Sequence, residues 1–261
     1  MKNQSISIAK AKSDLSLNGF AVLKGLLSNS KELEDLKDKI YKLVCIKANQ
    51  YNMTIPENYS ESINQKIMEI NSSNKLIGAF LNDSLNSSPE LFRLLSSETF
   101  ENLAQGVIGD NNSCMLTNNH RIRVQIPGHD SVSNLPWHQD SHYNNLYSEK
   151  NRSVAIWTSV NDIDMKAGPV VFKKGSHVIK QVTREEIKRP NGAIIYTLPD
   201  KYLNNSEFEE TLVETKSGDI ILIDMDVIHR SGENNSNNNI KFSLQCRCHD
   251  ASKEGFLPDY G

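Results

Sequence analysis

Apolar residues in the first hundred positions recur every three or four residues, which is the spacing of one face of a helix. The pattern predicts a helix that starts after Ser30 and carries the apolar residues of 33–44 on one side, with acidic residues in its first turn. A second helix is expected over 63–80, and a third starts at Pro89 and continues to about residue 103. Before them, residues 19–23 have the composition of a short strand. This part of the chain therefore predicts a helical layer.

The apolar period changes to two from about residue 113, as expected for strands with one buried face. The predicted strands are short, are separated by turn residues, and cover residues 121–126, 153–160, 169–172, 219–228 and 240–248. Strands of this kind favour a closed or sandwiched antiparallel sheet. We therefore expect one domain over residues 1–261, mainly β with α, in which the helix-rich segment 1–112 packs on a β jelly-roll core formed by residues 113–250.

Composition narrows the classes of function. The net charge is −3, whereas a dedicated nucleic-acid binder would show a strong basic excess, so we expect no nucleic-acid partner. The four cysteines form no C-x-x-C pair, which indicates reduced thiols. No stretch of about eighteen apolar residues could span a membrane, and residues 1–14 lack the apolar run of a signal peptide. A soluble, cytoplasmic protein is expected, and its oligomeric state is not indicated.

His138 and Asp140 follow a strand break at Pro127 and are two residues apart. On an extended backbone such residues point to the same face, so both side chains can reach one ion. His229, at the end of the predicted 219–228 strand, supplies a third ligand. Two imidazoles and one carboxylate leave three positions of an octahedron open, which is the arrangement that non-haem iron(II) oxygenases use. A lone His-x-Asp is a weak signal, because a hydrogen-bonded surface turn gives the same pattern.

The residues around these three candidates carry a stronger signal. The ordered motifs are Trp137-His138-Gln139-Asp140, Trp157 on the following strand, Ala167-Gly168-Pro169 leading to Gly175-Ser176-His177, and His229-Arg230-Ser231-Gly232 continuing to Arg247. In order and spacing they resemble the phytanoyl-CoA dioxygenase family of iron(II)/2-oxoglutarate oxygenases. The resemblance extends from Gly19 to Arg247, which is most of the chain.

The resemblance implies a double-stranded β-helix core, also called a cupin-like jelly roll. It implies iron(II) held by His138, Asp140 and His229, with 2-oxoglutarate as co-substrate and O2 as oxidant. The implied reaction is hydroxylation of a small molecule with release of succinate and CO2. Asp140 favours hydroxylation, because halogenating relatives have a small residue in its place. Two alternatives stay open: another metal-dependent enzyme on a cupin-like barrel, and a non-catalytic barrel that binds a small molecule.

The family places an arginine soon after the distal histidine to bind the far carboxylate of 2-oxoglutarate, and here the chain departs from that pattern. Lys241 comes into register if the 234–239 loop holds one extra residue, and Ser243 on the same strand face could add a hydroxyl donor. Arg247 shares that face and is the rival anchor. The structural alternatives are a solvated lysine beside an exposed loop and an arginine whose salt bridge closes the barrel end. By resemblance, Gln125 lies near the co-substrate and Trp157 packs against it.

The substrate side of the site is expected to be polar. Arg121 and Arg123 lie on the same strand face as Gln125, opposite an apolar face, which fits a barrel interior that receives a polar ligand. A solvated face would show the same alternation. His142 and Tyr143 follow Asp140 closely and are candidates for substrate contact at the mouth of the site. The two arginines indicate a polar or anionic metabolite, and nothing in the sequence identifies it further.

Overall fold

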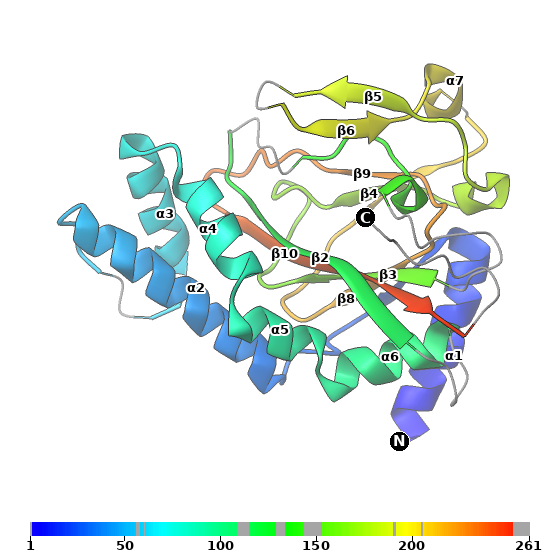
Figure 1. Ribbon diagram of the computed structural model, residues 1–261, viewed down its shortest axis with the longest axis horizontal. Helices are drawn as coiled ribbons and strands as arrows, with labels where there is room; N and C mark the ends of the chain where they lie inside the picture. The colour runs from blue at the N-terminus through cyan, green and yellow to red at the C-terminus, as the bar shows by residue number, and fades with distance from the viewer. Residues whose placement is uncertain are drawn as a thin grey trace.

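The computed structural model describes residues 2–55, 58–59, 61–108, 115–128, 134–143, 153–189, 192–204 and 206–252. Six helices come first, apart from one short strand between the first two, and β strands dominate the rest of the chain (Figure 1). The helices are α1 (Lys2–Asn18), α2 (Lys31–Gln50), α3 (Glu61–Ser73), α4 (Ile77–Asn86), α5 (Pro89–Leu95), α6 (Glu98–Ile108) and the short α7 (Asp200–Leu203), with 3-10 turns η1 (Asp140–Tyr143) and η2 (Ser176–Ile179).

The strands form two antiparallel sheets and a separate two-stranded ribbon. Their bounds are β1 (Phe20–Leu23), β2 (Met115–Gln125), β3 (Ser153–Ser159), β4 (Val170–Lys173), β5 (Glu185–Lys188), β6 (Ile194–Thr197), β7 (Glu210–Val213), β8 (Ile220–Ile223), β9 (His229–Ser231) and β10 (Lys241–Asp250). The larger sheet has the order β1-β8-β3-β10-β2, the smaller one has the order β7-β4-β9, and β5 pairs with β6. Helices α2 to α5 lie on the outer side of the larger sheet, and β4 and β9 lie on its other side (Figure 1). The predicted jelly roll with an N-terminal helical layer is confirmed.

Serine caps start two of the helices where the sequence predicted. The Ser30 hydroxyl accepts a hydrogen bond from the N–H of Leu33 at 3.2 Å, and Ser88 caps α5 in the same way before a proline at the first helical position. The helix expected over 63–80 is instead two helices, because the Asn74 side chain accepts the N–H of Leu76 and forms a turn. The helix expected to continue past residue 95 also ends there, where the Ser96 hydroxyl bonds the last-turn carbonyls.

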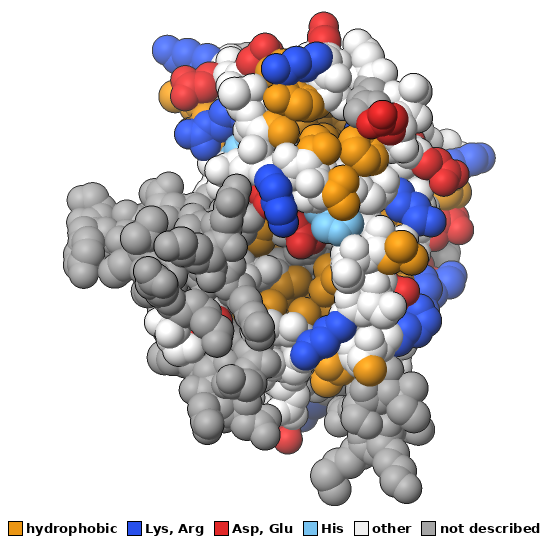
Figure 2. Space-filling view, turned by 90° about the vertical axis from the view of Figure 1, so that its right-hand side faces the viewer, with side chains coloured by type: hydrophobic (Ala, Val, Ile, Leu, Met, Phe, Trp, Pro, Cys, Tyr) orange, Lys and Arg blue, Asp and Glu red, His pale blue; other side chains and the backbone are white. Residues whose placement is uncertain are grey.

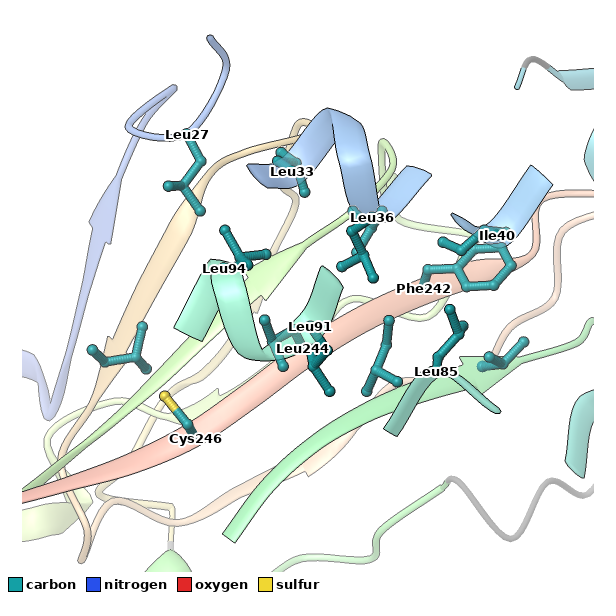
Figure 3. Close-up of a cluster of buried hydrophobic side chains, with 14 of the residues drawn as sticks. Leu27, Leu33, Leu36, Ile40, Leu85, Leu91, Leu94, Phe242, Leu244 and Cys246 are labelled. Atoms are coloured by element: carbon teal, nitrogen blue, oxygen red, sulfur yellow. The ribbon is translucent and has the colours of Figure 1, made fainter. Parts of the chain in front are cut away.

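Strand β10 shows how alternation divides the core from the site. Phe242, Leu244 and Cys246 are fully buried and point toward α2, α4 and α5, where they meet Leu36, Ile40, Leu85, Leu91 and Leu94 (Figure 3). Burying one such side chain is worth about 1.5–3 kcal/mol, so this contact fixes the register of β10. The intervening residues then face the interior between the two sheets. Lys241, Ser243 and Gln245 line a pocket there.

The prediction of one continuous strand over 219–228 is wrong, and the difference affects the site. Strand β8 ends at Ile223, and the chain turns before β9 begins at His229. The turn forms because the Asp224 carboxylate accepts the N–H of Asp226 at 2.9 Å, and the Asp224 carbonyl accepts the N–H of Val227 at 3.2 Å. This turn transfers the chain from the larger sheet to the smaller one.

Two features of the surface bear on the expected partners. Among the described residues, none of the helices is both long and apolar enough to cross a bilayer. Acidic and basic side chains are interspersed over the face on the right of Figure 1, as Figure 2 shows. The described cysteines, Cys45, Cys246 and Cys248, form no disulfide with one another, while Cys114 lies outside the described residues.

Candidate functional site

Two histidines and one aspartate meet between the two sheets. His138 and His229 form a reciprocal backbone bridge, with N–H to carbonyl distances of 2.9 and 3.0 Å, and their ring centroids lie 4.2 Å apart. Asp140 is not reached along an extended backbone, as the sequence suggested, because the chain turns into η1 at that residue. Its carboxylate still lies 3.9 Å from the Nε2 atom of His138. The three candidate ligand atoms all lie within 4.8 Å of one another, and all three residues are buried.

Backbone carbonyls fix the orientation of both imidazoles. The Nδ1 atom of His138 lies 2.7 Å from the carbonyl oxygen of Pro136, and that of His229 lies 3.0 Å from the carbonyl oxygen of Val227. A carbonyl oxygen only accepts, so each Nδ1 must carry the proton and each Nε2 offers a lone pair. Burial lowers the pKa of both rings, which keeps them neutral and able to bind a metal.

The carboxylate of Asp140 is held in its charged form. Burial alone would favour the neutral acid, but the Arg247 guanidinium and the two histidines lower the pKa of Asp140 well below its usual range. Arg247 forms an ion pair with Asp140 and donates a second hydrogen bond to the carbonyl of Asn119 at 3.1 Å. The salt bridge considered for Arg247 therefore exists, but its partner is Asp140 and not a residue at the barrel end. Two neutral imidazoles and one ionised carboxylate fit a divalent metal of the iron(II) type.

A pocket leads from the two histidines to Lys241. Its lining residues include His138, His229, Gln125, Trp157, Arg123, Lys241, Ser243 and Gln245. The expectation of a solvated lysine is wrong, because Lys241 is only 4% exposed and its ammonium donates to the carbonyl of Gly168 at 2.5 Å. Burial, together with the charge of Arg123, lowers the pKa of Lys241 to about 7.

The asparagine-rich loop supports this placement of Lys241. Asn234 is buried, and its side-chain amide donates to the carbonyls of Gln125 and Asn239, at 3.2 and 2.7 Å. The loop is therefore tied to the edge strand β2, which pairs with β10 so that Lys241 lies opposite Gln125. The Gln125 side chain in turn donates to the carbonyl of Gly232 at 3.1 Å.

A second pocket, with a volume of about 360 Å3, also has Arg123 in its lining. Its lining includes Arg121, Arg123, Tyr143, Arg189, Gln245 and Arg247, together with apolar residues of β6. Tyr143 also packs edge-on against the His138 ring, with centroids 5.5 Å apart. His142 is not among the described lining residues of either pocket, because its ring nitrogen bonds the carbonyl of Val182 at 2.8 Å.

The β5–β6 ribbon covers this second pocket. The hydroxyl of Tyr143 accepts the backbone N–H of Tyr196 at 2.8 Å and donates to its carbonyl at 3.2 Å. Arg184 stacks on the Tyr196 ring at 3.7 Å and donates to the carbonyl of His142. Arg189 at the other end donates to the carbonyl of Asn134. The ribbon is thus attached at both ends to the segment that carries His138 and Asp140.

The sequence model of the phytanoyl-CoA dioxygenase (PhyH) family matches residues 15–241. The chain belongs to this family. The resemblance inferred from the sequence motifs is confirmed. A curated family relative, the phytanoyl-CoA dioxygenase domain-containing protein 1 homolog of Dictyostelium discoideum, is 36% identical over 105 residues, which are 39% of this chain and 36% of the relative. The match thus spans about a third of the length of that relative.

Several solved structures share the fold of this phytanoyl-CoA dioxygenase family member. The epimerase SnoN in complex with Fe3+, alpha ketoglutarate and nogalamycin RO superposes with a TM-score of 0.61 at 14% identity, covering 97% of this chain and 87% of SnoN. EctD from S. alaskensis with 2-oxoglutarate and 5-hydroxyectoine gives 0.61 at 15%, covering 94% and 76%. AviO1 from Streptomyces viridochromogenes gives 0.58 at 16%, covering 96% and 98%. At these identities the likeness shows the fold.

Two residues that line the pockets of this family member, Arg189 and Arg230, were not predicted from the sequence. Arg189 follows β5, whose side chains are all exposed and give no period-two signal. Arg230 lines the pocket beside His229 and lies over the Trp137 ring at 5.0 Å. Its position directly after a metal-ligand candidate could have indicated it.

Proposed function

We propose that this member of the phytanoyl-CoA dioxygenase family is an iron(II)- and 2-oxoglutarate-dependent oxygenase that hydroxylates a small polar or anionic metabolite, using O2 and releasing succinate and CO2. The observation that carries the proposal is the buried group of His138, Asp140 and His229, whose ligand atoms lie within 4.8 Å of one another. The two histidines also line a pocket that contains Lys241. Family membership supports the same reaction class.

His138, Asp140 and His229 would hold the metal, which supplies the activation of O2 that no side chain can provide. Each histidine keeps Nε2 toward the metal position through its Nδ1 hydrogen bond to a backbone carbonyl. Arg247 keeps the Asp140 carboxylate ionised and limits its rotation. These contacts set the geometry of the three ligands before the reaction begins.

Lys241 would pair with the far carboxylate of 2-oxoglutarate, since an unpaired charge is costly in a buried pocket. Ser243 and Gln125 line the same pocket and offer polar groups, and Trp157 supplies an apolar wall. Arg121, Arg123 and Tyr143 would contact the substrate from the second pocket. His142 would instead hold the segment 182–184 beside the site, through hydrogen bonds with Val182 and Arg184.

The test is succinate formation from 2-oxoglutarate by the iron(II)-loaded protein across a panel of metabolites, with ascorbate present. His138→Ala and His229→Ala should remove most iron binding, measured by metal content after gel filtration, and nearly all succinate formation. Arg93→Gln, on the exposed face of α5, is the matched control. If both histidine variants keep wild-type iron content and rate, the proposed metal site is wrong. A cytoplasmic location stays a prediction from the cysteine pattern.

A further inference from the structure

The second pocket concentrates positive charge in a protein that has a net charge of −3. Arg121 and Arg123 lie two residues apart on the same face of β2, opposite Gln245 and Ser243 of β10. Arg189 reaches the same pocket from the end of the β5–β6 ribbon. Among the described lining residues of this pocket there is no carboxylate. Arg247 also lines the pocket, but its charge is balanced by Asp140.

Arg123 carries one donor that no described residue pairs with. Its Nε atom is buried without a hydrogen-bond partner among the described residues. Burial, together with the charges of Arg247 and Arg121, lowers the pKa of Arg123 to about 10, so the guanidinium remains charged at neutral pH. A buried donor that lacks a partner is destabilising unless a ligand pairs with it. Arg123 is therefore placed to bind an anion in the pocket.

The position of Arg123 links this anion to the reaction. Arg123 lines both the pocket that contains His138 and His229 and the pocket that contains Arg121 and Arg189. An anionic group bound by Arg123 and Arg121 would lie beside the metal site, under the ribbon that Arg189 belongs to. Guanidinium groups bind phosphate oxygens through paired N–H donors, so groups from two sides can hold one phosphate.

We propose that the substrate carries a dianionic phosphate monoester or phosphonate group, which Arg121, Arg123 and Arg189 bind in the second pocket. This proposal rests on the proposed function and specifies its substrate class. A dianion is favoured over a single carboxylate because Arg121, Arg123 and Arg189 form no ion pair with a described acidic residue, and one carboxylate would balance only one of them. The group would also bridge β2 and the ribbon, holding the ribbon over the site.

The experiment uses the full chain loaded with iron(II) and 2-oxoglutarate under argon, so that no turnover occurs. Inorganic phosphate, methylphosphonate and acetate serve as probes, and binding is measured by isothermal titration calorimetry at constant ionic strength. We expect saturable binding of phosphate and methylphosphonate and at least tenfold weaker binding of acetate. Arg123→Gln should weaken phosphate binding at least tenfold. Arg121→Gln, at an exposed position, should also weaken it, and Arg93→Gln should leave it unchanged.

Formation of the iron(II)–2-oxoglutarate complex is followed separately by the visible absorption that appears on chelation. If that absorption forms normally and phosphate does not bind, the substrate class is wrong and the proposed function stands. If the absorption does not form, the proposed function itself fails. If acetate binds as tightly as phosphate, the proposed preference of the pocket for a dianionic group is wrong. If phosphate competes with 2-oxoglutarate and Lys241→Met weakens phosphate binding, Arg123 belongs to the co-substrate pocket and the proposal is wrong.

Discussion

Replacing Lys241 by methionine removes the one cation that we assign to the far carboxylate of 2-oxoglutarate. The side chain is only 4% exposed, and among the described residues its ammonium donates to the carbonyl of Gly168, so water can replace the lost ammonium only poorly. A hydrogen bond to a charged group contributes about 1.5–3 kcal/mol. At about 1.4 kcal/mol for each factor of ten, the Kd of 2-oxoglutarate should rise roughly 10-fold to 150-fold. Methionine keeps a similar length, which limits the loss of packing.

The pH dependence of binding gives a second, independent measure of the same residue. In the free protein, burial and the charge of Arg123 lower the pKa of Lys241 to about 7. A bound carboxylate favours the protonated amine and raises that pKa, so binding takes up a proton when the solution is above pH 7. The affinity should be nearly constant below pH 7 and should fall above it, approaching about tenfold per pH unit. Lys241→Arg, which stays charged, should bind with little dependence on pH in this range.

Both effects can be measured in one assay. 2-Oxoglutarate is titrated into the iron(II)-loaded protein under argon, and the visible absorption of the chelate is recorded between pH 6.5 and 9, a range chosen to span the Lys241 pKa of about 7. Arg93→Met controls for the general loss of a cation. If Lys241→Met binds 2-oxoglutarate with wild-type affinity, Lys241 is not the anchor. The assignment is also wrong if the wild-type affinity for 2-oxoglutarate does not vary with pH and Lys241→Arg behaves identically.

Three further predictions concern the metal ligand, its partner and the loop beside the co-substrate pocket. Asp140→Gly should abolish hydroxylation, measured by product formation, and unchanged hydroxylation would mean that another carboxylate is the ligand. Arg247→Met should destabilise the metal-free protein by about 3–5 kcal/mol in urea unfolding, because the Asp140 charge loses its buried partner, and adding Asp140→Asn should restore much of the loss. Gly232→Ala should cost about 1–3 kcal/mol, because its Cβ would lie 2.3 Å from a backbone oxygen, whereas Gly78→Ala, with its nearest contact at 3.4 Å, should not destabilise.

The sequence predicted the elements whose signals are local. Alternation along β10 placed Phe242 and Leu244 in the core and Lys241 on the opposite face, and the structure has both arrangements. The Ser30 cap and the apolar spacing likewise predicted α2. Family motifs brought together His138 and His229, which are far apart in the chain, although no local pattern links them. The confirmed jelly roll follows from these signals.

The remaining features depend on contacts that no local pattern encodes. The ion pair between Arg247 and Asp140 joins residues 107 positions apart, and it exists because β10 carries Arg247 past a register shift that follows Gln245. The ribbon that carries Arg189 has one exposed strand, β5, and one mostly half-buried strand, β6, and neither alternates between buried and exposed residues, so periodicity could not predict it. The turn after β8 depends on a side-chain hydrogen bond of Asp224. Apolar residues lie on both sides of that turn, so the sequence pattern predicted one continuous strand.

The paired backbone hydrogen bonds between His138 and His229 have a consequence for how the protein matures. Because the fold itself holds both imidazoles in place, an incoming metal has to order little of the chain, and the entropy of assembling its ligands is spent during folding. Metal loading then becomes a late and reversible event, separate from the acquisition of structure. We therefore expect the chain to fold in a metal-poor cell and to bind iron(II) later, when the ion becomes available.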